Sequence, residues 1–282
     1  MFSRGVTATI ALLLALFPIA ADAAIVTFSA SGANPAAIQA TVDSFRNALG
    51  ANNGVGGSFP SGRREINWDG TPAAFSAPNN LPPDFFNVNS PRGVVFSTPG
   101  SGFQVSGDGS SVASPLEFGN LNATYPDQFT TFSPLKLFTP LGSNTTDVAF
   151  FIPGTNTPAT TMGFGAVFTD VDLANTTSIT AFDANGASLG TFPVLAQNQG
   201  LSFLGLLSDG STPFFGRVRI VTGNAAPGPN DGGAVDVAVM DDFVYGEPTA
   251  VPEPTTLLLI GSALVGLGGR RLAQAVRRLA GR

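Results

Sequence analysis

The chain has 282 residues and a formal net charge of −6, and it contains neither cysteine nor histidine. The absence of these two residue types excludes disulfides, Ser-His-Asp and Cys-His catalysis, and the usual ligands of zinc, copper and haem. The chemistry that remains open is carboxylate chemistry, Ca²⁺ binding through oxygen atoms, or no chemistry.

Residues 1–23 have the pattern of a secretory signal peptide. Arg4 supplies the positive charge, residues 10–20 form an apolar stretch, and Ala21-Asp22-Ala23 is a small-x-small cleavage site. We expect signal peptidase to cut after Ala23 or Ala24, so that the rest of the chain is exported.

Residues 24–246 are long enough to form one secreted domain with its own core. This body is more acidic than the whole chain, because five of the arginines stand in the C-terminal tail. An acidic body repels nucleic acid, so no nucleic-acid partner is expected, but it can attract divalent cations.

One amphipathic helix is predicted near the start of the body, over residues 35–49. Asn34 is a suitable N-cap, Pro35 suits the first helical position, and Gly50 suits the position after the helix. Apolar residues recur at helical spacing within it, namely Ile38, Val42, Phe45 and Leu49.

Residues 50–92 are rich in glycine and proline, which argues against a central strand and favours an ordered loop over one end of a sheet. Trp68, Phe85 and Phe86 lie in this segment. Loop aromatics of this kind can form a platform on which a sugar ring stacks, but more often they cap the core beneath a long loop.

From residue 94 to residue 245 the pattern changes to short apolar runs separated by turn residues, which predicts a mainly β fold of the β-sandwich or jelly-roll type. Asn185-Gly186 between two such runs is a hairpin signal, and Asp209-Gly210 stands between two more.

Four aspartates are candidate Ca²⁺ ligands. Asp170 and Asp172 are two residues apart, so both point to one face of a strand, and Asp241 and Asp242 stand near the end of the body. Asp231 and Asp236 precede the second pair. The alternative is that these aspartates belong to solvated strand faces and turns, with no cofactor.

Other carboxylates could in principle support glycoside hydrolysis, which needs two of them at a defined separation. They are Glu65, Asp69, Glu117 and Glu247. Sequence distance places no pair of them together, so we expect surface or turn carboxylates and a protein that is not an enzyme.

The C-terminal tail has three parts. Val251-Pro252-Glu253-Pro254 ends a short linker over 247–254, an uncharged apolar run covers 255–268, and a basic cluster follows. The cluster contains Arg270, Arg271, Arg277 and Arg278. The apolar run is shorter than the roughly 20 residues of a spanning helix, but Val251 on one side and Leu272, Ala273 and Ala275 on the other can extend it. Residues 255–282 are therefore expected to form a transmembrane helix and a basic tail. The arginines would then stay on the cytoplasmic side of the inner membrane.

This order of motif, apolar run and arginines resembles the PEP-CTERM sorting signal of Gram-negative bacteria. The resemblance implies a membrane-anchored precursor that an exosortase cuts, followed by a place at the cell surface or in the extracellular matrix. A plain anchor that is never cut, or a buried core helix, are the alternatives.

Three stretches of the body resemble other PEP-CTERM proteins and jelly-roll modules of the carbohydrate-binding type: 164–170, 182–186 and 240–246. The resemblance transfers no catalytic residue. The sequence therefore predicts a structural or adhesive module that associates with exopolysaccharide. A Ca²⁺-dependent carbohydrate-binding module and a carboxylate-based carbohydrate-active enzyme are the alternatives.

Overall fold

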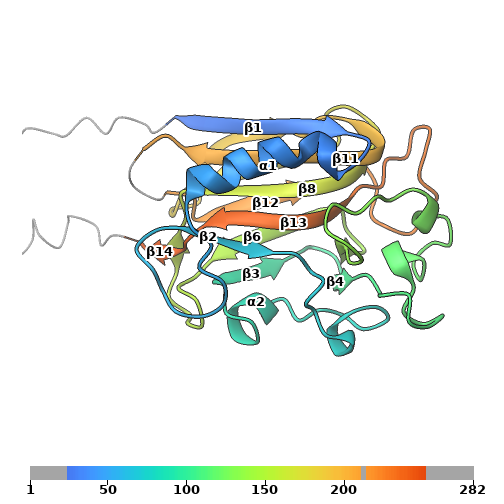
Figure 1. Cartoon of the computed structure of the whole chain (residues 1–282), viewed down its shortest axis with the longest axis horizontal. Coiled ribbons are helices and arrows are strands. Elements are labelled where there is room, and N and C mark those ends of the chain that lie inside the picture. The colour runs from blue at the N-terminus through green and yellow to red at the C-terminus, as the bar shows by residue number, and fades with distance from the viewer. Residues whose placement is uncertain (1–23, 211–213, 252–282) are drawn as a thin grey trace, which may run out of the picture.

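A mainly β body in three layers makes up the described part of the chain (Figure 1). The computed structural model describes residues 24–210 and 214–251. The predicted signal peptide and the predicted C-terminal helix lie outside these residues. Within them, no helix is long and apolar enough to cross a membrane.

Two antiparallel sheets and one short ladder contain the strands. The larger sheet has the order β1 (Ile25–Gly32), β11 (Gln197–Ser208), β8 (Gly163–Val171), β13 (Val239–Gly246), β5 (Phe138–Leu141) and β4 (Gly102–Val105), with β2 (Arg63–Ile66) also paired to β13. The smaller sheet has the order β10 (Ser188–Pro193), β9 (Ser178–Phe182), β12 (Arg217–Val221), β6 (Thr145–Phe150) and β3 (Val94–Ser97). A separate ladder joins β14 (Thr249–Ala250) to β7 (Ala159–Thr160).

The two sheets pack face to face around the main core. Phe164 and Phe168 of β8 point to the same side of their strand, and they share one buried cluster with Val148 of β6 and Val218 of β12. Side chains on the inner faces of the two sheets therefore form the core of a β-sandwich, as predicted from the apolar pattern. That the sandwich is a jelly roll stays a prediction.

The third layer is helix α1 (Pro35–Leu49), which covers the outer face of the larger sheet (Figure 1). Its predicted bounds are confirmed, and the Asn34 side chain accepts a hydrogen bond from the Ala37 amide at 3.3 Å. Phe45 lies over Gly165 and Gly205, which face each other across β8 and β11. A Cβ atom on either glycine would come within 3 Å of the Phe45 ring, so a side chain there would displace the helix.

Three short 3₁₀ turns and a four-residue helix complete the body. They are Ala73–Phe75, Leu116–Phe118, Tyr125–Asp127 and α2 (Phe85–Val88). The second and third turns lie in a long connection that has its own small apolar cluster, in which Phe118, Tyr125 and Phe129 meet Val237 and Val239.

Some expectations about the elements were wrong. Strand β2 lies inside the segment expected to be loop, because its pairing with β13 outweighs the surrounding glycines and prolines. Residues 247–250, expected to be linker, belong to the fold through β14. The hairpin predicted at Asn185-Gly186 is confirmed by the pairing of β9 with β10. Asp209-Gly210 does not form a hairpin turn, because β11 and β12 on either side of it belong to different sheets.

Candidate functional site

Three aspartates meet at one end of the larger sheet. Asp170 and Asp172 come from the end of β8, and Asp231 comes from the loop that precedes β13. One carboxylate oxygen from each lies within 4.8 Å of the other two. We call these residues the aspartate triad. Asp170 and Asp172 lie together, as the sequence predicts, and Asp231 is added to them.

A bulge in the neighbouring strand shapes the triad. Gln197 of β11 pairs with Val171 and Leu201 pairs with Thr169, so three residues of β11 stand opposite one residue of β8. That one residue is Asp170, which has a left-handed backbone with φ of 62°. Bulges of this kind re-aim side chains at the edges of functional sites. Here the Gln199 amide donates to Asp170 Oδ1 at 2.7 Å.

The loop that carries Asp231 is tied down on both sides. The Val237 amide donates to Asp231 Oδ1 at 2.6 Å. The Asp236 carboxylate accepts hydrogen bonds from the Asp172 and Leu173 amides at 3.3 and 3.2 Å. Asp236 is therefore engaged in bracing the turn after β8, and its role is to position Asp172 and the loop relative to each other.

Burial and mutual repulsion make it unfavourable for all three triad carboxyl groups to be ionised together. Burial raises the pKa of Asp170 to about 8, and the charges of Asp231 and Asp172 add to this rise. Burial and the Asp231 charge also raise the pKa of Asp172. Among the described residues, no ion pair involves Asp170, Asp172 or Asp231, so no arginine or lysine neutralises the triad in this way.

Asp241 and Asp242, the other two candidate ligands, do not join this cluster. They stand in a register shift of β13, between Met240 and Phe243. Asp241 accepts from the Phe132 amide at 2.6 Å and from the Ser133 hydroxyl at 3.1 Å. The Ser133 hydroxyl also lies 2.7 Å from Asp242 Oδ1. Burial raises the pKa of both carboxyls.

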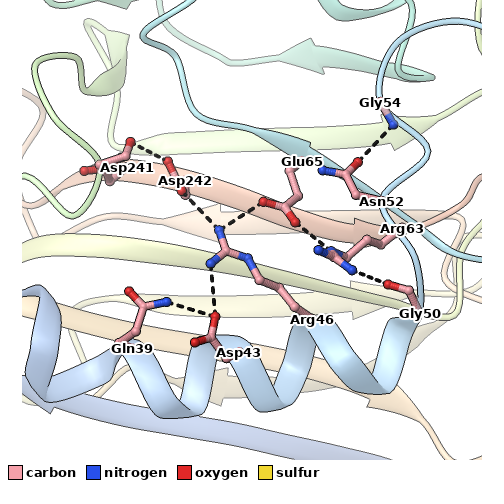
Figure 2. A network of polar contacts seen from close by, with 11 residues as sticks. Gln39, Asp43, Arg46, Gly50, Asn52, Gly54, Arg63, Glu65, Asp241 and Asp242 are labelled. Carbon is pink, nitrogen blue, oxygen red and sulfur yellow. Dashed lines mark hydrogen bonds and ion pairs between the residues drawn. The ribbon is translucent and has the colours of Figure 1, made fainter.

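A second polar network joins α1 to the sheet (Figure 2). Arg46 of α1 contacts Asp43 at 3.3 Å, Glu65 of β2 at 3.0 Å and Asp242 of β13 at 3.5 Å. Arg63 adds a 2.6 Å ion pair to Glu65. These contacts hold the helix on the outer face of the sheet, and Arg46 was missed by the sequence analysis because it reads as an ordinary exposed helix residue.

The most buried ion pair joins Arg64 of β2 to Glu247. Nε and Nη2 of Arg64 contact the two carboxylate oxygens at 2.5 and 2.7 Å, and both side chains are essentially inaccessible. The remaining Arg64 donors reach the carbonyl oxygens of Gly54, Gly56 and Gly57. This pair therefore fastens the loop before β2 to the C-terminal end of the body.

The loop aromatics do not form a sugar-stacking platform, which was the less favoured of their two interpretations. Trp68, Phe85 and Phe86 have exposed fractions of 1%, 6% and 4%, so the large aromatic faces are inside the core. The Trp68 ring stacks on Phe138 at 4.1 Å, and its Nε1 donates to the Asp241 carbonyl at 2.8 Å. They cap the core beneath the loop, as the alternative interpretation expected.

The carboxylates considered for glycoside hydrolysis lie in separate surroundings. Glu65 and Glu247 are engaged with arginines, and Asp69 accepts from the Lys136 amide at 3.0 Å. Burial and the nearby Asp127 charge raise the pKa of Glu117 to about 7.

A sequence comparison identifies the tail. Residues 250–272 match the PEP-CTERM protein-sorting motif. The chain carries a PEP-CTERM sorting signal. It is therefore an exported protein that is anchored in the membrane before exosortase processes it. The match includes the sorting motif Val251–Pro254, Arg270 and Arg271, whereas Arg277 and Arg278 lie beyond it. No curated protein and no solved structure matches the chain.

Proposed function

We propose that the body is a non-catalytic structural or adhesive module, which exosortase cleavage near Pro252–Pro254 releases into the extracellular polysaccharide matrix. One observation carries the proposal: the last strand of the described residues ends where the sorting motif begins. Strand β14 ends at Ala250, and the motif covers 250–272. A cut after Val251 would leave every strand of the body in place.

The end of the body is also fastened independently of the tail. Glu247 is held by Arg64 and accepts a hydrogen bond from the Asn53 side chain at 2.8 Å. The start of β1 and the ladder of β14 lie at the same end of the molecule (Figure 1). That end would face the membrane in the precursor, and the aspartate triad would face away from it.

The surroundings of the carboxylates support a non-catalytic role. A retaining or inverting glycosidase needs two carboxyl groups facing each other across a cleft, one of them able to give a proton. Glu65 and Asp242 both line a polar cleft of about 460 Å³, but both contact Arg46, at 3.0 and 3.5 Å, so neither is a free carboxyl group there.

A carbohydrate-binding role is the second candidate, because that same cleft offers hydrogen-bonding groups of both kinds. Asn52, Asn67 and Arg92 line it beside Glu65, and Phe132 supplies an apolar wall. Planar polar side chains next to an aromatic ring are the usual means by which proteins recognise sugar hydroxyls and sugar faces.

Mass spectrometry of membrane, surface and released fractions tests the proposal. We expect the released form to end near Pro254 without the arginines, and to co-fractionate with exopolysaccharide. A Glu253→Gln variant should accumulate in the membrane with an intact C-terminus, whereas Asp209→Asn, the same chemical change on an exposed body residue, should be processed normally. An intact C-terminus found only in membranes would refute cleavage. Released protein that stays free of polysaccharide would refute the matrix role.

A further inference from the structure

We propose that the aspartate triad binds a Ca²⁺ ion, which joins the end of β8 to the loop before β13. The geometry fits such an ion. Ca²⁺ takes oxygen ligands at 2.3–2.6 Å, so two ligands of one ion lie at most about 5 Å apart. The three carboxylate oxygens of the triad meet this limit, since all lie within 4.8 Å of one another.

A second observation, independent of the clustering, points to a missing ligand. Asp170 has no exposed surface, and its Oδ1 accepts a hydrogen bond from the Gln199 amide. Among the described residues, its Oδ2 has no hydrogen-bond partner, and neither does the buried Oδ1 of Asp172. Buried carboxylate oxygens are almost always paired, because leaving one unpaired costs the full loss of its hydration.

The charge of the site favours a cation. Three carboxylates share a small volume, and the ion pairs of the described residues all lie elsewhere. A divalent ion would replace the lost hydration and remove the mutual repulsion of the carboxylates. The alternative is that buried protons neutralise the triad, and the experiment below separates the two.

The ligands favour Ca²⁺ over other metals. The chain contains no histidine and no cysteine, so transition metals lack their preferred ligands here. Asp170 is fully buried, whereas Asp172 and Asp231 are partly exposed, which leaves room for water to complete the coordination. Ca²⁺ tolerates such irregular sites of carboxylates and water, whereas Mg²⁺ demands a near-ideal octahedron.

The position of the triad in the sheet indicates which segments a bound ion would join. Leu201 of β11 pairs with Gly32 at the end of β1, whereas Ser208 pairs with Ile25 at its start. The triad lies beside residues 197–201 and is therefore at the end of the sheet away from the start of β1. The connection between β12 and β13 that carries Asp231 contains no strand of either sheet, and a bound ion would add a link from it to β8.

The test is calorimetric titration of Ca²⁺ into the purified, EGTA-treated protein, combined with thermal melting in Ca²⁺ and in EGTA. We expect one saturable site per chain below about 1 mM, the weak end of protein Ca²⁺ affinities, and a higher Tm in Ca²⁺. Asp231→Asn should lower the affinity at least tenfold. Asp209→Asn, at the opposite end of β11, should leave it unchanged.

The variants also separate a metal site from a structural role. An asparagine at position 231 can still accept the hydrogen bond from the Val237 amide. The Tm of Asp231→Asn in EGTA should therefore equal or exceed that of the wild type, whereas the rise in Tm on adding Ca²⁺ should be lost. A variant that melts lower than wild type in EGTA and keeps the shift would overturn the proposal. So would a protein that binds no Ca²⁺, or one that binds Mg²⁺ equally well. None of these results depends on tail cleavage or on polysaccharide, so the proposed function is tested separately.

Discussion

Replacing Arg64 by methionine tests whether the buried ion pair fastens the end of the body. Methionine keeps the length and apolar contacts of the side chain, but it leaves the Glu247 carboxylate without its bidentate partner at 2.5 and 2.7 Å. Removing one member of a buried pair costs about 3–5 kcal/mol, because the other charge remains buried without compensation.

The other contacts of Arg64 contribute less to this magnitude. The carbonyl oxygens of Gly54 and Gly57 belong to exposed residues, so water can replace the guanidinium there. Glu247 keeps two donors, the Asn53 side chain and the Phe59 amide. We therefore expect a loss near the lower end of the range, about 3 kcal/mol in the free energy of unfolding.

Urea unfolding of the wild type, Arg64→Met, Glu247→Leu and the double variant forms the assay. Because the double variant buries no unpaired charge, the cycle should give a coupling energy of at least about 2 kcal/mol. Arg219→Met is the control, since Arg219 pairs with Asp147 but its side chain is 46% exposed, and it should cost at most about 1 kcal/mol. Equal losses for Arg64→Met and Arg219→Met, or additive losses in the cycle, would refute the reasoning.

Two further predictions concern stability. The pKa of Glu117 is raised to about 7 by burial and by Asp127, so its carboxyl binds a proton more tightly when folded, and the resulting stability is lost as the pH rises from about 4.5 to 7. Glu117→Gln should reduce the change in the free energy of unfolding over this pH range, measured by urea unfolding, by at most about 2 kcal/mol after solvent screening. A profile equal to that of the wild type would contradict the prediction. Gly205→Ala should destabilise the protein by about 1–3 kcal/mol through overlap with Phe45. Gly70→Ala, where a Cβ meets nothing within 4 Å, should be nearly neutral in the same thermal melts.

Local signals predicted the elements that local contacts stabilise. The helix at 35–49 has its cap, its proline and its apolar face within sixteen consecutive residues, so the sequence contains all the information needed. The 185–186 hairpin is similar, because its turn residues and both strands are adjacent. Strand β2 was missed because the strand with which it pairs, β13, lies far along the chain.

The candidate site divides in the same way. Asp170 and Asp172 could be paired from the sequence because alternation in a strand puts them on one side. Asp231 could not be added, because only the folded loop brings it across to β8. Asp241 and Asp242 looked equivalent in sequence, but a register shift in β13 turns them toward Ser133 and Arg46 instead.

The aromatic residues give the opposite lesson about loops. The sequence left open whether Trp68 lies on the surface of its glycine- and proline-rich loop or caps the core, and the structure buries it against Phe138. A large apolar side chain gains roughly 2–3 kcal/mol from such burial, which favours the core position of Trp68. An exported protein that must remain folded near a membrane, without disulfides, has a strong reason to place its only tryptophan in the core. The polar cleft beside Arg46 is then the better place to look for a sugar, and the aspartate triad is the better place to look for a metal.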